Sequence, residues 1–210
     1  MSANPLVVVL HGPSGVGKDS VIDELRRKTG IFRATSTTSR LPRKNETDGV
    51  DYHFVTSEEF ERRIAMGEFL EHARVYGDWK GLEKREVLVP LAEGRDVIIR
   101  TDVQGARRWR EVLEGAVFIF LMAEDREALR ARLIGRGSED GVSLAARIGE
   151  LEDELDDMEN NDYIVINHHG LLDDTVAEID AIIERERQNP HRPRAGVRAP
   201  AAPPAPGEND

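Results

Sequence analysis

The sequence predicts an α/β protein, a doubly wound parallel sheet with an inserted lobe and a lid. First, an unbroken apolar run, Leu6–Leu10, is followed by a glycine-rich loop and then by apolar residues at helical spacing in Asp19–Lys28. Second, comparable apolar runs recur, each followed by a helical stretch, and this alternation is typical of parallel sheets. Third, residues 35–90 break the alternation, which indicates an insertion.

The repeated strand–helix units can be read in order along the chain. The first expected strand, Leu6–Leu10, lacks polar alternation, so both of its faces should be buried, and the later apolar runs resemble it. The expected strands are Leu6–Leu10, Val97–Arg100, Ala116–Met122 and Tyr163–Ile166. The expected helices are Asp19–Lys28, Gln104–Leu113, Glu127–Ile134 and Leu171–Arg187.

The interruptions set the expected domain boundaries. Residues 1–187 form one domain, with a core of 5–34 and 91–187, an acceptor lobe of 35–90 and a lid of 135–147. Within the lobe, Thr56 and Glu59 have the spacing of a capping box that opens a helix through Ile64. Residues 188–210 are rich in Pro and Ala, and we expect them to be disordered.

Bulk composition excludes several classes of protein. The net charge of −11 argues against a partner that is a nucleic-acid polymer, because such proteins usually carry a basic stripe. The 210 residues include no cysteine, which excludes disulfides and thiolate metal sites. The N-terminal apolar run is too short for a signal peptide, and no run is long enough for a membrane span. We therefore expect a cytoplasmic protein without membrane contacts.

The stretch "GPSGVGKDS", Gly12 to Ser20, has the spacing of a phosphate-binding loop. Its glycines let backbone N–H groups face phosphate oxygens at the start of a helix. We expect Lys18 to face solvent and to act by its charge on the β- and γ-phosphates. The following position, where Ser or Thr is usual, holds Asp19.

Two further groups of side chains suggest anion binding. Ser36, Arg40, Arg43 and Tyr52 could hold a second phosphate opposite the loop, since guanidinium groups bind phosphate bidentately. Arg132, Arg136 and Arg147 flank or lie in the expected lid, where arginines can stabilise a transferring phosphoryl group. Salt bridges on a helix face are the alternative role, which is as well supported as the functional one for Arg132.

Between Leu6 and Arg187 the chain resembles the guanylate kinase family. The motifs that carry the resemblance are "GPSGVGK", "TSTTSRLPRKNETDGVDYHFV", "GEFLEHARVYG", "DVQGA", "ARLIGRG" and "IVIN". The resemblance implies a P-loop kinase fold and transfer of the γ-phosphoryl group of Mg²⁺-bound ATP to a small nucleotide acceptor, nominally GMP.

The resemblance also implies roles for individual residues. Lys18, Arg136 and Arg147 would be the catalytic cations. The residues implied for ATP are Gly12, Ser14, Gly15, Val16, Gly17, Lys18, Asp19, Ser20 and Asn167. The residues implied for the acceptor are Ser36, Arg40, Arg43, Tyr52, Glu71, Lys80 and Asp102, with Glu71 and Asp102 reading the guanine edge.

The chain also departs from the family pattern. Where the family reads "YYGT" or "YYGS", this chain reads "WKGLE", so that Lys80 replaces a phosphate-binding tyrosine and Leu82 replaces a base-reading hydroxyl. Arg100 replaces the first acid of the family's "DID". The "GKDS" loop is similar to that of ribose 1,5-bisphosphate phosphokinases, which also lack that acid.

We interpret Asp19 as a metal-side residue for Mg²⁺, with Arg100 as its counterweight. The alternative is that Asp19 only favours the first turn of its helix through the helix dipole. Two other functions stay open: a kinase for a modified nucleotide or phosphorylated sugar, and a non-catalytic guanylate kinase-like interaction module. The intact loop and the lid arginines favour an enzyme, and the sequence does not indicate an oligomeric state.

Overall fold

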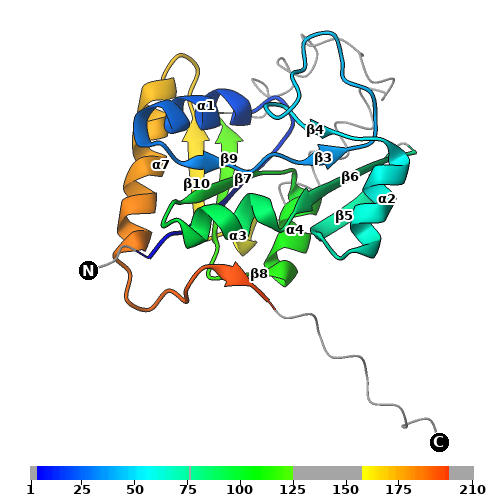
Figure 1. Ribbon diagram of the computed structural model, residues 1–210. Helices are drawn as coiled ribbons and strands as arrows, with labels where there is room; N and C mark the ends of the chain where they lie inside the picture. The colour runs from blue at the N-terminus through cyan, green and yellow to red at the C-terminus, as the bar shows by residue number, and fades with distance from the viewer. Residues whose placement is uncertain (1–3, 76, 125–157, 199–210) are drawn as a thin grey trace, which may run out of the picture.

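The computed structural model describes residues 4–75, 77–124 and 158–198 of the chain (Figure 1). A five-stranded sheet forms its centre, and all of its neighbouring strands are parallel. Its order is β10 (Tyr163–Asn167), β9 (Val117–Ala123), β1 (Val7–His11), β7 (Val97–Arg100) and β2 (Phe32–Arg33). The predicted parallel α/β architecture is therefore confirmed.

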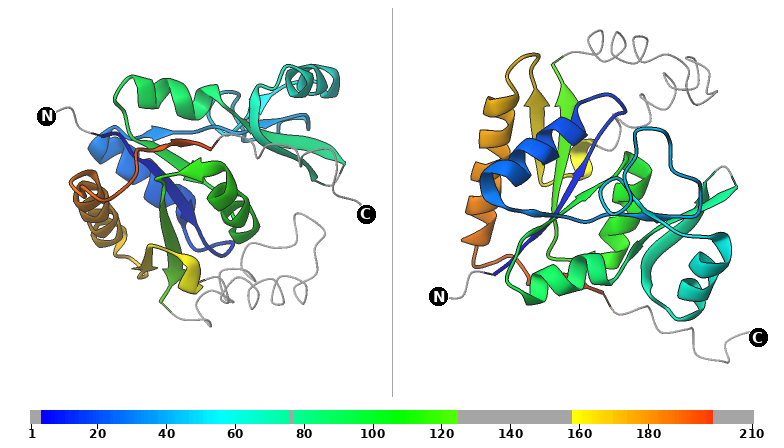
Figure 2. Two further views of the ribbon diagram at one scale, coloured as in Figure 1. Left: turned by 90° about the horizontal axis from the view of Figure 1, so that it is seen from below. Right: turned by 45° about the horizontal axis from the view of Figure 1, so that its top comes forward.

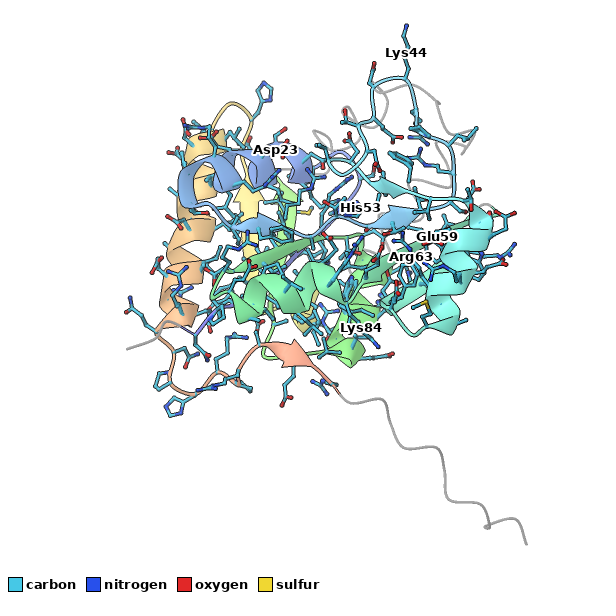
Figure 3. All side chains as sticks on the ribbon, viewed as in Figure 1. Asp23, Lys44, His53, Glu59, Arg63 and Lys84 are labelled. Carbon is cyan, nitrogen blue, oxygen red and sulfur yellow. The ribbon has the colours of Figure 1, made fainter. Side chains whose placement is uncertain are left out.

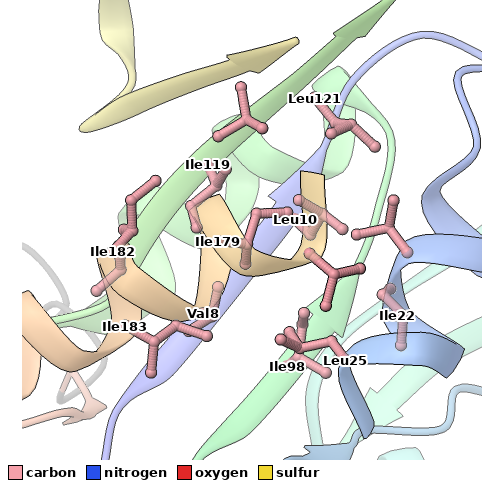
Figure 4. Packing of buried hydrophobic residues seen from close by; sticks show 14 of the residues in the cluster. Val8, Leu10, Ile22, Leu25, Ile98, Ile119, Leu121, Ile179, Ile182 and Ile183 are labelled. Carbon is pink, nitrogen blue, oxygen red and sulfur yellow. The ribbon is translucent and has the colours of Figure 1, made fainter. Parts of the chain in front are cut away.

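Helices cover both faces of this sheet, as the alternating strands and helices predicted. On one face, α1 (Lys18–Thr29) and α7 (Leu172–Arg187) pack on a cluster that includes Val8 and Leu10 (Figure 4). On the other face, α3 (Arg85–Ala92) and α4 (Val103–Val112) pack on a cluster that includes Val7 and Val9. Successive side chains of β1 thus enter opposite cores, so the whole strand is buried.

A second sheet forms the lobe, at the right of Figure 1. Its order is β4 (His53–Phe54), β3 (Thr37–Thr38), β6 (Asp78–Glu83) and β5 (Phe69–Val75). The helix α2 (Ser57–Ala65) covers it, and the ring of Phe60 stacks on those of Phe69 and Trp79 at centroid distances of 4.3 and 5.7 Å. The Thr56 hydroxyl accepts from the Glu59 N–H at 3.2 Å, as the capping motif predicted.

The lobe is shorter than its expected range of 35–90. The helix α3 begins within that range, yet Val87 is fully buried in the core cluster on the central sheet, and Leu91 packs against this cluster. The end of the lobe could not be located from the sequence, because the segment before α3 is polar. The apolar face of α3 is recognisable only once the helix packs on the central sheet. The lobe sheet ends at Glu83.

The C-terminal strap, defined here as residues 188–198, is placed against the core. Its strand β11 (Gly196–Val197) pairs antiparallel with β8 (Leu113–Glu114), at the bottom of Figure 1. Arg192 binds the buried carboxylate of Glu186 and donates to the Ala116 carbonyl at 2.9 Å. The expectation of disorder is wrong for 188–198, because these polar contacts and the packing of Ala195 and Val197 against the core cluster hold the segment in place.

Figure 2 shows from below how the strap passes the edge of the core, between α7 and β8. The remaining tail, 199–210, lies outside the described residues. So do the expected lid, 135–147, and the expected helix Glu127–Ile134. Across the parts of the chain that the structure describes, none of the helices has the length and apolar character needed to cross a membrane.

The strap contact generates a stability prediction. Replacing Arg192 by Ala leaves the Glu186 carboxylate buried without a charged partner, which should lower the free energy of unfolding by about 1–3 kcal/mol. Urea unfolding measures the loss. Arg194→Ala is the matched control, since this exposed arginine lies in the same strap. Equal effects of the two substitutions would contradict the assigned contact.

The same contact should depend on pH. Burial alone raises the pKa of Glu186, but hydrogen bonds from Tyr163, Arg192 and Asn189 outweigh it and hold this pKa below the ordinary 4.5. A lowered pKa contributes stability above the ordinary value that is lost as the pH falls below it. The difference between the wild type and Arg192→Ala should therefore shrink below pH 4.5.

Candidate active site

A cavity of about 550 Å³ opens where β1 and β7 end, between the phosphate loop and the lobe. Parallel sheets gather their ligand groups at the carboxyl ends of strands, as here. One wall consists of the loop and the start of α1, including Ser14, Gly15, Gly17, Lys18, Asp19 and Ser20. The lobe contributes Ser36, Tyr52 and Lys80 to the opposite wall. The structure thus brings together most of the two predicted anion sites.

The phosphate loop can follow its path only with glycine at two positions. Gly12 has φ +141°, and a Cβ there would lie 2.2 Å from the Leu121 carbonyl oxygen of β9. Gly17 has φ +100°, and its Cβ would lie 2.7 Å from the Asn167 amide nitrogen. The loop is therefore packed closely against two neighbouring strands, β9 and β10.

Asn167 supports this loop from β10. Its amide nitrogen donates to the Val16 carbonyl at 2.8 Å, and its amide oxygen accepts from the Thr175 hydroxyl at 3.0 Å. The side chain is buried beneath the loop. The structure thus gives Asn167 a bracing role, while its predicted contact with adenine stays a prediction.

Lys18 does not face solvent, and that expectation is wrong. Its Nζ donates to the carbonyls of Gly12 and Pro13 at 2.6 and 2.8 Å, and only 9% of the residue is exposed. The loop curls around the ammonium group because two carbonyls of the turn point inward. The positive charge therefore lies inside the loop, where phosphates would be held.

Asp19 and Arg100 are paired across the cavity wall. Arg100 Nη1 lies 3.2 Å from Asp19 Oδ1. The same oxygen lies 3.3 Å from the guanidinium of Arg33, a residue of β2 that the sequence analysis did not single out. No motif contains Arg33, and it reaches Asp19 because β2 and α1 are neighbours in the fold.

Arg40 is organised by a second residue that the sequence analysis missed. Its guanidinium binds Glu46 through two hydrogen bonds of 2.6 and 2.5 Å and lies 5.0 Å from the Tyr52 ring centroid. The Arg43 backbone N–H donates to the same carboxylate at 2.8 Å. Hydrogen bonds from Arg40, aided by that of Arg43, hold the pKa of Glu46 at about 2 despite its partial burial.

Arg40 and Arg43 do not line the cavity itself, whereas Lys80 and Tyr52 do. The Lys80 ammonium lies 5.4 Å from the Tyr52 ring centroid, within reach of a cation–π interaction. Asp102 also lines the cavity and caps α4, accepting from the Gly105 N–H at 2.7 Å. One carboxylate oxygen of Asp102 is thus occupied by the helix start.

A β-bulge orients Glu71. The register of β5 against β6 shifts between Phe69 and Glu71, so that these two residues do not share a face as regular alternation would require. Phe69 and Arg74 face α2, where they contact Phe60 and Trp79, respectively. Glu71 consequently lies on the face of β5 opposite Phe69 and Arg74, although it does not itself line the cavity. Burial raises the pKa of its carboxyl group, Arg108 and Lys80 oppose this rise, and Asp102 adds to it.

Leu82 lies deeper than a base-reading residue would. It is only 2% exposed and belongs to the core cluster that contains Val9 and Val87. The departure from the family pattern therefore adds an apolar anchor between lobe and core. Arg132, Arg136 and Arg147, by contrast, lie outside the described residues.

The fold family implies magnesium, and the cavity wall can be tested for it. Among the described residues, no group of three or more His, Cys, Asp or Glu could hold a metal ion. Asp19 and Ser20, however, both line the cavity beside the loop. Mg²⁺ is typically bound by one or two carboxylates together with waters and substrate phosphates, so this oxygen set fits it.

The chain was compared with known proteins. A family model described as "Guanylate kinase" matches residues 4–186. "Guanylate kinase 2, chloroplastic/mitochondrial" from Oryza sativa subsp. japonica is 44% identical over 190 residues, covering 90% of this chain and 67% of that protein. "Guanylate kinase" from Clostridium perfringens strain SM101 is 42% identical over 183 residues, covering 87% and 84%, respectively.

A solved structure agrees with these sequences. The crystal structure of guanylate kinase from Anaplasma phagocytophilum superposes with a TM-score of 0.71 at 29% identity, covering 91% of this chain and 90% of that chain. The match extends over the central sheet and the lobe alike. The chain belongs to the guanylate kinase family.

Proposed function

We propose that this protein is a kinase that transfers the γ-phosphoryl group of ATP to GMP. The observation that carries the proposal is that the phosphate loop and the lobe residues Ser36, Tyr52 and Lys80 line the same cavity. Phosphoryl transfer depends mainly on positioning and electrostatic stabilisation, and a cavity with two facing anion sites supplies both.

On the donor side, loop N–H groups and Lys18 bind the triphosphate. The ammonium of Lys18 can leave the carbonyls of Gly12 and Pro13 for a phosphate oxygen without leaving the loop. Asp19 and Ser20 would hold Mg²⁺, which when bound neutralises charge on the β- and γ-phosphates. Arg136 and Arg147 complete the proposed catalytic cations.

On the acceptor side, Ser36, Tyr52 and Lys80 bind the phosphate of GMP together with Arg40 and Arg43. Glu46 fixes the plane of the Arg40 guanidinium, which prepares it for bidentate contact. Glu71 and Asp102 accept hydrogen bonds from the N–H donors of the guanine edge. Homologues named guanylate kinase support GMP over the modified nucleotide or sugar phosphate that the sequence left open.

The proposal is tested with the full-length protein, ATP and magnesium. GMP should be phosphorylated, and AMP, CMP and UMP should be far poorer acceptors. Lys18→Met should lower kcat by about 100-fold or more, because a cation aimed at developing charge is removed. Coupled ADP release measures both results. A wild type that phosphorylates another of these nucleotides better than GMP would contradict the proposed acceptor.

A second prediction concerns the positioning of Arg40. Glu46→Gln keeps the size of the side chain and removes its charge, so it should raise the KM for GMP by about tenfold and leave the KM for ATP nearly unchanged. Glu59→Gln is the matched control, because Glu59 also binds two arginines and its pKa is also about 2, but it lies on α2 (Figure 3). If Glu59→Gln raised the KM for GMP equally, the cause would be a less stable lobe and not the loss of Arg40 positioning.

A third prediction follows from the raised pKa of Glu71. The ionised carboxylate accepts the guanine donors, so its protonation removes an acceptor. The KM for GMP should rise as the pH falls, beginning above the ordinary glutamate pKa of 4.5, while the KM for ATP stays flat. In Glu71→Gln the KM for GMP should be high at every pH. An unchanged pH profile in this variant would assign the titration to another group.

A further inference from the structure

An ion-pair network links the phosphate loop to two strands. Arg33 of β2 lies 3.3 Å from Asp19 and 3.2 Å from Asp23, both on α1. Arg100 of β7 lies 3.2 Å from Asp19 on the same carboxylate oxygen. Arg26 lies a further 3.9 Å from Asp23, so the network contains two acids and three guanidinium groups.

The two arginines differ in how firmly they are held. The Arg33 side chain is only 12% exposed and has two carboxylate partners. The Arg100 side chain is 40% exposed, and among the described residues Asp19 is the carboxylate that pairs with it. Exposed ion pairs are weak, so Arg100 is the more easily released of the two.

Arg100 also stands between the two predicted anion sites. It is the last residue of β7 and is in register with Leu10 of β1, two residues before the loop begins. Asp102, two residues further along, lines the same cavity. The guanidinium therefore lies in the wall of the cavity where a γ-phosphoryl group would meet its acceptor.

It is chemically favourable for Arg100 to exchange its partner Asp19 for a phosphate group. A guanidinium binds a phosphate bidentately through charge-assisted hydrogen bonds, which are stronger than an exposed pair with one carboxylate oxygen. When Arg100 moves to a phosphate, Asp19 keeps Arg33 as a partner. Neither charge is left unpaired in the exchange.

We infer that Arg100 is a further catalytic residue that binds the γ-phosphoryl group of the donor nucleotide, and that Asp19 holds it in the cleft until the nucleotide arrives. The inference rests on the proposed function only in taking ATP as the donor. It also accounts for a carboxylate on a phosphate loop. Paired with two guanidinium groups, Asp19 does not repel the triphosphate as a bare acid would.

Nucleotide binding tests the inference independently of the acceptor. Isothermal calorimetry would compare the β,γ-imido analogue of ATP with ADP, each with Mg²⁺, on the full-length protein. Arg100→Gln should weaken binding of the analogue by about tenfold and binding of ADP by less than about twofold, because only the analogue carries the third phosphate. Arg95→Gln is the matched control. Arg95 also pairs with a carboxylate, that of Glu93, and the side chains of this pair are 47% and 53% exposed, similar to those of Arg100 and Asp19. Arg95 does not line the cavity.

A second variant tests the role of Asp19. Without Mg²⁺, Asp19→Asn should bind the analogue more tightly than the wild type, because a negative charge is lost and Arg100 is released. With Mg²⁺ this gain should shrink or reverse, since Asp19 is then a metal-side residue.

Three outcomes would overturn the inference. Arg100→Gln could bind both nucleotides like the wild type, or it could weaken both equally, which would mean that Arg100 supports the loop. Asp19→Asn could leave binding without Mg²⁺ unchanged, which would mean that Asp19 does not hold Arg100. Failure to phosphorylate GMP would contradict the proposed acceptor but would not alter these binding comparisons.

Discussion

The close approach of the phosphate loop to β9 and β10 is the constraint on which the candidate site depends. A Cβ at Gly12 would lie 2.2 Å from the backbone carbonyl oxygen of Leu121, and a Cβ at Gly17 would lie 2.7 Å from the side-chain amide nitrogen of Asn167. This loop ends β1, starts α1 and turns its carbonyls around Lys18. The same fully buried strand that feeds the loop also separates the two hydrophobic cores.

The positions of side chains in the lobe are fixed by contacts that residues of this particular sequence make. Leu82 joins the lobe to the core as an apolar anchor, and a bulge in β5 places Glu71 on the face opposite Phe69. Glu46 orders Arg40 although neither residue belongs to a helix or strand. A polar loop is thereby given a defined geometry by charge-assisted hydrogen bonds in place of backbone pairing.

In the wall of the cavity, an acidic and a basic side chain compensate each other's charge beside the two predicted anion sites. An acid on the loop and a base at the end of β7 reverse the arrangement that the family resemblance implies, yet they compensate one another at 3.2 Å. Arg33 pairs with Asp19 from the buried side, so Asp19 would keep a partner in the proposed exchange. The charges beside the candidate donor site thus come from three elements, α1, β2 and β7.

Features that depend on neighbouring residues could be read from the sequence. The unbroken apolar run Leu6–Leu10 predicts a strand buried on both faces, the glycine spacing predicts the loop, and Thr56 with Glu59 predicts the start of α2. These patterns are local, so the parallel sheet, its helices and the candidate donor site could be predicted from them.

Features that join distant segments become apparent only in the folded chain. The pairings of Arg33 with Asp19 and of Arg192 with Glu186 leave no periodic or spaced signal in the chain. The inward position of Lys18 and the burial of Leu82 likewise depend on what the surrounding backbone offers. Composition alone predicted disorder for the C-terminal strap, because hydrogen bonds to a sheet that forms elsewhere cannot be read from Pro, Arg and Ala content.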